Sequence, residues 1–231
     1  MLIQNVIPEI SDRIMTKQTS TVGSSTYQRI KTDIIFGRLE PGSKLKLEAL
    51  KERYATSNST LRETLNRLTS EGFVESPEQR GFKVTPVSPD DLIEIADLRV
   101  LLECHALRQS IGNGDADWEG NLVAAHHKLH LLEQRMQAGD HSEKELWKHY
   151  DSEFHKAMIA ACNSQNLLSL HAILYDKYLR YQNLVLTYRG DEAVQEHKGM
   201  FDAALARDVK TATQLLEDHI RNGLDHTLAA M

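Results

Sequence analysis

The 231-residue sequence predicts a mainly α-helical protein. A winged helix-turn-helix is predicted between residues 24 and 87, because three short helical segments are followed there by a β-hairpin pattern. An antiparallel bundle of six to seven helices is predicted over residues 88–231, where long segments with one apolar stripe alternate with short loops. Residues 1–23 carry no sustained periodicity, so we expect a flexible N-terminal arm.

Composition and charge exclude several classes of protein and favour others. The two cysteines, Cys104 and Cys162, have no C-x-x-C spacing, which argues against a disulfide framework and a zinc finger. No apolar run is long enough to cross a membrane, and the first residues lack the basic segment of a signal peptide, so we expect a cytoplasmic protein with no membrane partner. Residues 24–87 carry a net charge of +3 and the remainder carries −9, which suits a nucleic-acid-binding unit attached to a larger acidic one.

The winged helix-turn-helix is predicted from its periodicity and its stops. Leu61, Leu65 and Leu68 line one face of the third helix, and Gly72 ends it. The predicted elements are helices over residues 25–37, 46–55 and from Ser57 to Gly72, a turn over residues 39–45, and strands over residues 73–75 and 82–85.

The opening of the third helix suits a DNA-reading element. A recognition helix places its N-terminal residues at base edges in the major groove. Arg can pair bidentately with guanine, and Asn with adenine. The competing interpretation is that residues 57–60 are only an N-cap and Arg62 is only a solvated side chain. The predicted DNA-contacting residues, including two lysines before the second helix and the wing tip, are Lys44, Lys46, Ser57, Asn58, Ser59, Thr60, Arg62, Arg67, Gln79, Arg80 and Gly81.

These segments resemble the N-terminal domain of GntR-family bacterial transcription regulators. The matching blocks, within about residues 24–87, are DIIFGRLEPGSKL, LKERYATSNSTLRETLNRLTSEGFVE and RGFKV. The sequence departs from the family pattern where Asn58 and Glu48 replace arginines, Thr60 replaces proline and Thr64 replaces alanine. Two missing cations imply weaker phosphate binding and a different base preference, with Arg62 as the main anchor.

The sequence after residue 87 predicts consecutive helices. Ser88 suits an N-cap, with Pro89 at the first helical position and Asp91 two residues later. The predicted helices span about residues 89–112, 116–138, 143–162, 165–188, 191–207 and 209–229.

Four polar residues are predicted to face the bundle interior. Asp151 and His155 are one helical turn apart, a spacing that allows two ligands to one metal ion. His197 and His219 each lie in line with apolar residues of their helices. Three imidazoles and one carboxylate can bind a divalent transition metal of the zinc, nickel or manganese type, and an octahedral ion would keep two positions open. Any one of these histidines, taken singly, is more commonly an ordinary core or surface residue.

This region resembles the all-helical effector domain of the FadR subfamily, called FCD. The matching blocks are LRVLLECHAL, YDSEFHKAMIAACNSQNL, EHKGMFDAALARD and LLEDHI. The resemblance implies that Asp151, His155, His197 and His219 are the metal ligands. The other eight histidines are expected to be ordinary: His105, His126, His127, His130, His141, His149, His171 and His226.

Arg99 is the candidate for effector binding. The resemblance places an arginine here in the ligand cavity, where a guanidinium can pair with a carboxylate. The alternative is a surface ion pair with Glu103, one turn along the helix. Asn166, Arg180 and Tyr181 could also line the cavity, and the sequence does not decide this.

Together these features predict a homodimeric bacterial repressor. Residues 24–87 would bind a near-palindromic double-stranded DNA operator, and residues 88–231 would dimerise and bind a divalent metal with a small carboxylate metabolite. The main alternative is a metal-dependent hydrolase that uses the same Asp and His residues. That reading lacks an H-E-x-x-H motif and leaves residues 25–87 unexplained. A helical adaptor that uses the N-terminal domain for protein contacts is a third possibility.

Overall fold

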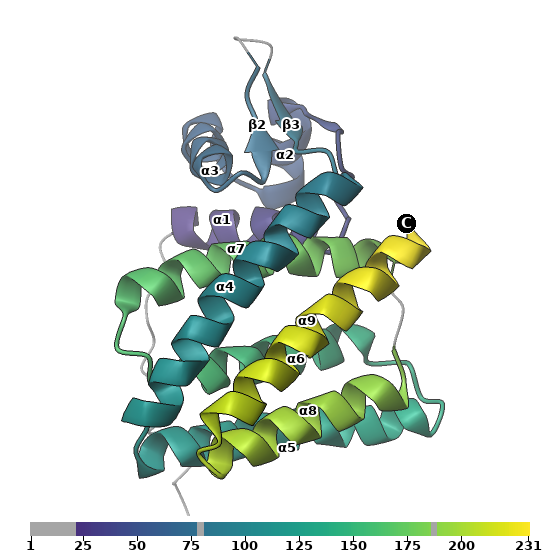
Figure 1. Ribbon diagram of the computed structural model, residues 1–231. Helices are drawn as coiled ribbons and strands as arrows, with labels where there is room; N and C mark the ends of the chain where they lie inside the picture. Colours follow the sequence, from purple (N-terminus) through teal and green to yellow (C-terminus); the bar gives the residue numbers. More distant parts are fainter. Residues whose placement is uncertain (1–21, 78–80, 186–188) are drawn as a thin grey trace, which may run out of the picture.

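A computed structural model describes residues 22–77, 81–185 and 189–231 (Figure 1). Gln79 and Arg80, at the predicted wing tip, lie outside the described residues, as does nearly all of the predicted arm. The described part is mainly α-helical, with a small three-stranded sheet in the N-terminal region and helices alone from residue 89 onward, which confirms the predicted fold class. In the described residues, no helix is both long and apolar enough to cross a membrane.

The N-terminal domain contains the predicted helix-turn-helix and wing. Its elements, in chain order, are α1 (Val22–Ile35), β1 (Lys44–Leu45), α2 (Leu47–Tyr54), α3 (Asn58–Ser70), β2 (Val74–Glu75) and β3 (Phe82–Val84). The strands form one antiparallel sheet in the order β1-β3-β2. Two sequence predictions need correction: α1 begins two residues inside the range assigned to the arm, and the end of the predicted turn over residues 39–45 is strand β1. That strand is too short to show alternation, and its pairing with β3 is a long-range contact.

Local chemistry explains the ends of α3. The Ser57 side chain accepts a hydrogen bond from the Thr60 backbone N–H at 3.2 Å and so caps the helix. At the other end, Gly72 adopts a φ of +79°, a left-handed conformation that favours glycine and turns the chain into β2. Between these ends, Leu61, Leu65 and Leu68 are fully buried. The exposed face of α3 is thereby fixed relative to the rest of the domain.

Removing side-chain volume under α3 should destabilise the N-terminal domain. Leu65 has 0% exposure, so Leu65→Ala is expected to lower the free energy of unfolding by about 2–5 kcal/mol through lost burial and a residual cavity. Leu170→Ala is the matched control, because Leu170 is 60% exposed and its truncation should change stability by less than about 0.5 kcal/mol. Urea denaturation followed by circular dichroism compares the two. Equal losses would show that Leu65 does not hold α3 in place.

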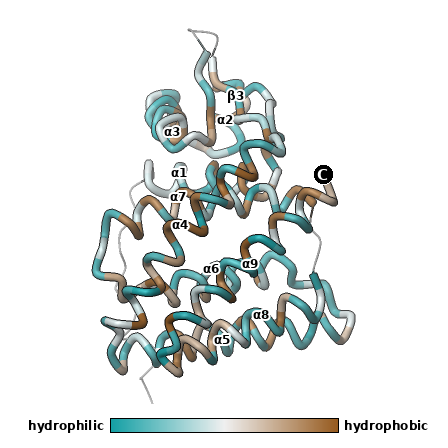
Figure 2. Tube along the Cα trace, viewed as in Figure 1, coloured by the Kyte–Doolittle hydropathy of each residue, from teal (hydrophilic) through white to brown (hydrophobic). Residues whose placement is uncertain are grey.

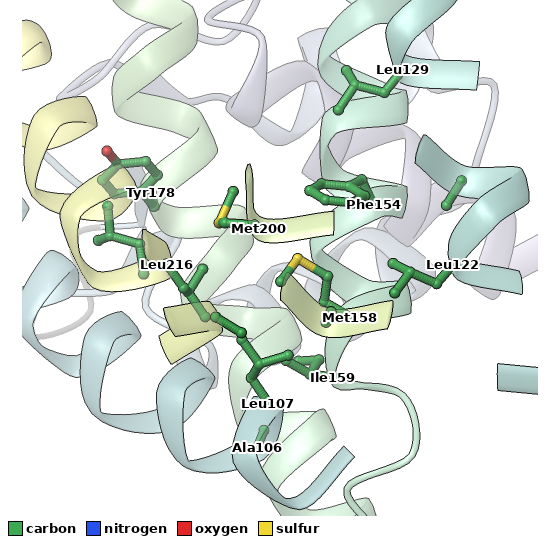
Figure 3. Packing of buried hydrophobic residues seen from close by; sticks show 14 of the residues in the cluster. Ala106, Leu107, Leu122, Leu129, Phe154, Met158, Ile159, Tyr178, Met200 and Leu216 are labelled. Carbon is green, nitrogen blue, oxygen red and sulfur yellow. The ribbon is translucent and has the colours of Figure 1, made fainter. Parts of the chain in front are cut away.

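Six helices follow within the described residues from 89 onward, as predicted, with ends within a few residues of expectation. They are α4 (Pro89–Asn113), α5 (Ala116–Gln137), α6 (Lys144–Ile159), α7 (Gln165–Val185), α8 (Asp191–Leu205) and α9 (Val209–Ala230). Helix α4 packs on α7 and α9, and α5 packs on α6 and α8 (Figure 1). Hydrophobic and hydrophilic residues alternate along the helices, as expected for amphipathic elements that each bury one face (Figure 2). Figure 3 shows the apolar centre, where Leu107, Met158, Met200 and Leu216 come together from four helices.

Helix α7 connects the bundle to the DNA-binding domain. Leu179 belongs to the buried core of the N-terminal domain although it lies in α7. Asn183 donates a hydrogen bond to the Ile35 carbonyl oxygen at 3.2 Å, and Lys31 forms an ion pair with Asp176 at 2.8 Å. The two domains therefore share a packed contact.

Candidate metal centre and DNA-reading helix

The N-terminus of α3 presents the predicted polar residues to solvent. Ser57, Asn58, Ser59 and Arg62 are exposed, and Thr60 is partly exposed. Among the described residues, the Arg62 side chain has no hydrogen-bond or ion-pair partner, so its guanidinium is available to a ligand. The Asn58 amide reaches Glu48 Oε1 at 3.4 Å, a weak contact between two of the positions that depart from the family pattern. Ser57 both caps the helix and stands at its exposed tip.

The other predicted DNA-contacting residues differ in whether they are exposed or held by contacts within the protein. Lys44 and Lys46 are exposed beside the start of α2, and Gly81 has an exposed backbone with a φ of +87°. Arg67, in contrast, lies 3.3 Å from Glu71 Oε1 and 3.7 Å from the centre of the Tyr27 ring. Arg67 is thus held against α1, which the sequence pattern did not predict.

The four predicted metal ligands meet in one place. Asp151 and His155 come from α6, His197 from α8 and His219 from α9, and all four are buried. One ligand atom from each lies within 4.8 Å of the others. We call these residues the Asp–His cluster. Helical spacing puts Asp151 and His155 on one face of α6, and the packing of α8 and α9 brings the other two histidines to that face.

Each histidine of the cluster contacts a glutamate carboxylate through its Nδ1 atom. His155 Nδ1 lies 3.2 Å from Glu103 Oε2 and His197 Nδ1 lies 2.6 Å from Glu133 Oε1. The third contact joins His219 Nδ1 to Glu196 Oε2 at 2.7 Å. The contacts of these three glutamates with histidines were not predicted from the sequence, because each joins residues at least 23 positions apart.

This arrangement suits a divalent cation. When each Nδ1–H donates to its carboxylate, the three Nε2 lone pairs point into the shared space, as in carboxylate–histidine–metal arrangements. His155 Nε2 and His219 Nε2 already face each other at 3.2 Å, where two lone pairs repel unless a proton or a cation lies between them. Asp151 adds a hard oxygen 3.2 Å from His197 Nε2, and the Tyr175 hydroxyl holds its other oxygen at 3.0 Å. The donor set therefore fits a zinc-, nickel- or manganese-type ion.

The charges around the cluster shift its pKa values in opposite directions. Burial disfavours the imidazolium of His197, but the carboxylates of Asp151 and Glu133 outweigh it and raise the His197 pKa to about 9. Burial lowers the pKa of His155 despite Glu103. Burial and the two neighbouring histidines lower the pKa of His219 far below its ordinary value. Without a cation, His197 therefore carries a proton at neutral pH, whereas the other two imidazoles are neutral.

Metal affinity should consequently rise with pH. A metal ion must displace the proton from His197, whose pKa of about 9 lies above neutral pH. The apparent association constant is expected to increase roughly tenfold per pH unit from pH 7 to about pH 9 and then level off. Competition with a chelator of known affinity at pH 7, 8, 9 and 10 measures this. A flat profile between pH 7 and pH 9 would contradict the assigned protonation of His197.

A small cavity adjoins the cluster. It has a volume of about 30 Å³, which admits only small groups. Besides the cluster it is lined by polar residues of α4, α6 and α7 and by residues of α9, among them Arg99, Lys148, Tyr175, Tyr178, Gln182 and Gly223. Arg99 is 2% exposed and lies over the rings of Tyr175 and Tyr178 at 4.6 and 4.3 Å.

Arg99 both forms an ion pair and lies in the cavity wall. It does pair with Glu103, at 2.6 Å, but that pair is buried and not on the surface. The same side chain lines the cavity. Glu103 also lies 3.2 Å from His155 and 3.1 Å from His171, so His171 is a buried core histidine of this polar network.

Three further candidates do not line the cavity. Asn166 is exposed at the start of α7. Arg180 donates to the Thr85 carbonyl oxygen, and the Tyr181 hydroxyl donates to Asp91 at 2.5 Å. Arg180 and Tyr181 therefore contact the segment that joins the two domains. Helical periodicity alone could not tell them apart from the residues of α7 that line the cavity.

Comparison with known proteins is consistent with this architecture. Residues 23–84 match the model of the gntR family of bacterial regulatory proteins, and residues 94–222 match the FCD domain model. The chain is 41% identical to the uncharacterized HTH-type transcriptional regulator BphR of Paraburkholderia xenovorans over 202 residues, covering 87% of this chain and 82% of BphR. It is 34% identical to the HTH-type transcriptional repressor GlaR of Escherichia coli, covering 84% of this chain and 90% of GlaR.

Solved structures share the fold. Escherichia coli McbR/YncC superposes with a TM-score of 0.77 at 20% identity, covering 90% of this chain and 98% of McbR/YncC. A GntR transcriptional regulator from Rhodococcus sp. RHA1 gives a TM-score of 0.74 at 19% identity, with coverage of 90% and 98%. These matches do not favour the hydrolase alternative. The chain belongs to the GntR family, with a C-terminal FCD domain, and is a DNA-binding transcription regulator.

Proposed function

We propose that this protein is a metabolite-responsive repressor whose Asp–His cluster binds a divalent metal and, through it, a small carboxylate. The observation that carries the proposal is the convergence of three buried imidazoles and Asp151 beside a polar cavity. Repression is supported by relatives, because GlaR and the galactonate operon regulator of Escherichia coli are both named transcriptional repressors.

Each part of the cluster has a role in this proposal. His155, His197, His219 and Asp151 would hold the ion, with Glu103, Glu133 and Glu196 orienting the imidazoles. The bound ion supplies positive charge and open coordination positions to an effector carboxylate. Arg99 would orient that carboxylate from the cavity wall, although Glu103 already neutralises much of its charge.

Helix α7 offers the route from the cavity to DNA. Tyr175 and Tyr178 face the cavity, whereas Leu179 and Asn183 contact the N-terminal domain. A ligand that shifts α7 therefore changes both sets of contacts. The effector would act by favouring one arrangement of the domains over another, so its differential affinity for the two arrangements sets the size of the response.

DNA recognition would follow the helix-turn-helix pattern. Residues 24–87 would bind DNA and residues 88–231 would bind the effector and form a cytoplasmic homodimer, with residues 1–23 as an arm. In that dimer each α3 would enter the major groove at one half-site of a near-palindromic operator. Arg62, Asn58 and Ser59 would reach the base edges from the exposed tip of α3, and Arg67 would contribute less because Glu71 holds it. The wing tip, with Gln79, Arg80 and Gly81, would contact the minor groove or phosphates.

Elemental analysis combined with DNA selection tests this proposal. Purified protein is expected to carry about one transition-metal ion per chain and to enrich a near-palindromic sequence from fragmented genomic DNA. A chain that binds no zinc, nickel or manganese at micromolar concentration would remove the metal from the mechanism. Failure to enrich any sequence, with or without metal, would count against the assigned role of α3.

A further inference from the structure

Lys148 is a buried cation that lacks an anionic partner. It lies on α6, is 7% exposed and lines the cavity. Its ammonium group donates to Gln182 Oε1 at 2.9 Å and lies 4.3 Å from the centre of the Trp147 ring. Within the described residues, no carboxylate lies at ion-pair distance from it. Burying an unpaired charge is costly, and burial lowers the pKa of Lys148 to about 8. The ammonium group stays mostly protonated at neutral pH, so an anionic ligand beside it would offset that cost.

The other cations that line the cavity are already matched. Arg99 pairs with Glu103 at 2.6 Å, and Arg189 pairs with Glu196 at 2.6 Å. Lys148 is three positions before Asp151 on the same helix, so the two side chains are neighbours on one face of α6. The unmatched positive charge therefore lies about one helical turn from the Asp–His cluster.

A second unused donor also lines the cavity. The Tyr178 hydroxyl is buried and, among the described residues, has no hydrogen-bond partner. Burial raises its pKa, so it stays a neutral donor. Gly223 makes room for it, because an added Cβ there would lie 2.7 Å from Tyr178 Oη and 3.7 Å from Gln182 Nε2. Lys148, Tyr178 and Gln182 all line the cavity, and the first two have donors that an anion there could use.

We propose that Lys148 and Tyr178 form a second anion subsite, so that the effector is a short dicarboxylate. This inference rests on the proposed function, in which one carboxylate binds at the Asp–His cluster. Lys148 and Tyr178 would then bind the second carboxylate, and their two donors match its two oxygens, whereas a phosphate presents three. Because the cavity has a volume of only about 30 Å³, binding requires the side chains that line it to move apart, and a short chain between the two carboxylates requires the least movement.

Matched acids test the second subsite. Isothermal titration calorimetry compares succinate with butyrate and glutarate with pentanoate, using protein loaded with zinc, nickel or manganese. We expect each dicarboxylate to bind roughly tenfold or more tightly than its partner, the magnitude of one hydrogen bond to a charged group. In Lys148→Met this ratio should fall to about one, and in Lys148→Arg, which keeps the charge, it should partly return. Tyr178→Phe, which removes only the hydroxyl, should lower the ratio about threefold to tenfold.

The outcomes separate this inference from the proposed function. A wild-type ratio of about one, or a ratio that persists in Lys148→Met with unchanged circular dichroism, overturns the second subsite. If monocarboxylates still bind in a metal-dependent way, the proposed function stands without it. If neither class of acid binds any metal-loaded form, both proposals fail.

Discussion

Arg62→Ala is expected to abolish specific operator binding while the fold stays intact. Arg62 is exposed at the tip of α3, and the described residues give it no partner, so its guanidinium is available to a base. A bidentate Arg–guanine pair contributes about 1–3 kcal/mol at each half-site, and a dimer makes two of them. Operator affinity should fall roughly 30-fold or more, measured by fluorescence anisotropy at fixed salt.

Two variants sharpen this prediction. Arg62→Lys keeps the charge but not the bidentate geometry, so it should lose sequence preference while keeping more of the non-specific affinity. Arg108→Ala removes an exposed arginine of α4 and should leave operator affinity unchanged within about threefold. If Arg62→Ala binds operator as well as Arg108→Ala does, Arg62 does not read DNA, and the interpretation of residues 57–60 as only a helix cap would stand.

The double variant His155→Ala, His197→Ala should remove the bound metal and the effector response. These residues supply two of the four ligand atoms that lie within 4.8 Å of one another. Loss of a residue that only orients a ligand typically costs about 10–100-fold in metal affinity, so losing two ligands should cost more than 100-fold. Metal content by elemental analysis should fall to background, and operator affinity without effector should persist, because both residues lie outside the DNA-binding domain.

The matched control for this variant uses two exposed histidines. His105→Ala, His127→Ala removes the same number of imidazoles from the surfaces of α4 and α5. It should retain both the metal and the response. Circular dichroism must show that the His155, His197 variant is folded, since Glu103 and Glu133 each lose a histidine contact there. A folded variant that still responds normally to the effector would refute a metal-centred mechanism.

Much of this fold could be predicted from the sequence. The periods of the helices, the Ser57 cap and the Gly72 stop are local features, so they could be read from neighbouring residues. Strand β1 could not, because two residues show no alternation and its pairing partner lies almost 40 positions away. The four cluster residues could be identified from the sequence only through the family resemblance. No single one of the eleven histidines differs from the others in its sequence pattern.

The site residues that were not predicted from the sequence were missed for one physical reason. Glu103, Glu133 and Glu196 look like solvent-facing charges in helices of mixed polarity, and only tertiary packing turns them toward histidines of other segments. The burial of Lys148 could not be predicted either, because a lysine is almost never fully buried unless it is paired. The Arg99–Glu103 pair could be read from its spacing, but its burial between α4 and α7 could not. Burial of charge depends on contacts between helices, and sequence periodicity does not report them.

The proposed regulation requires that the Asp–His cluster and α3 are coupled, and the operator dissociation constant reports this coupling. The carboxylate that co-purifies with the protein is first identified by mass spectrometry of the small molecules that denatured protein releases. The operator dissociation constant is then measured with and without that carboxylate, for metal-loaded and metal-free protein. We expect the carboxylate to weaken operator binding at least fivefold when metal is present, a typical allosteric coupling of about 1 kcal/mol or more, and to have no effect when metal is absent. An operator affinity that is the same under all four conditions would contradict the coupling.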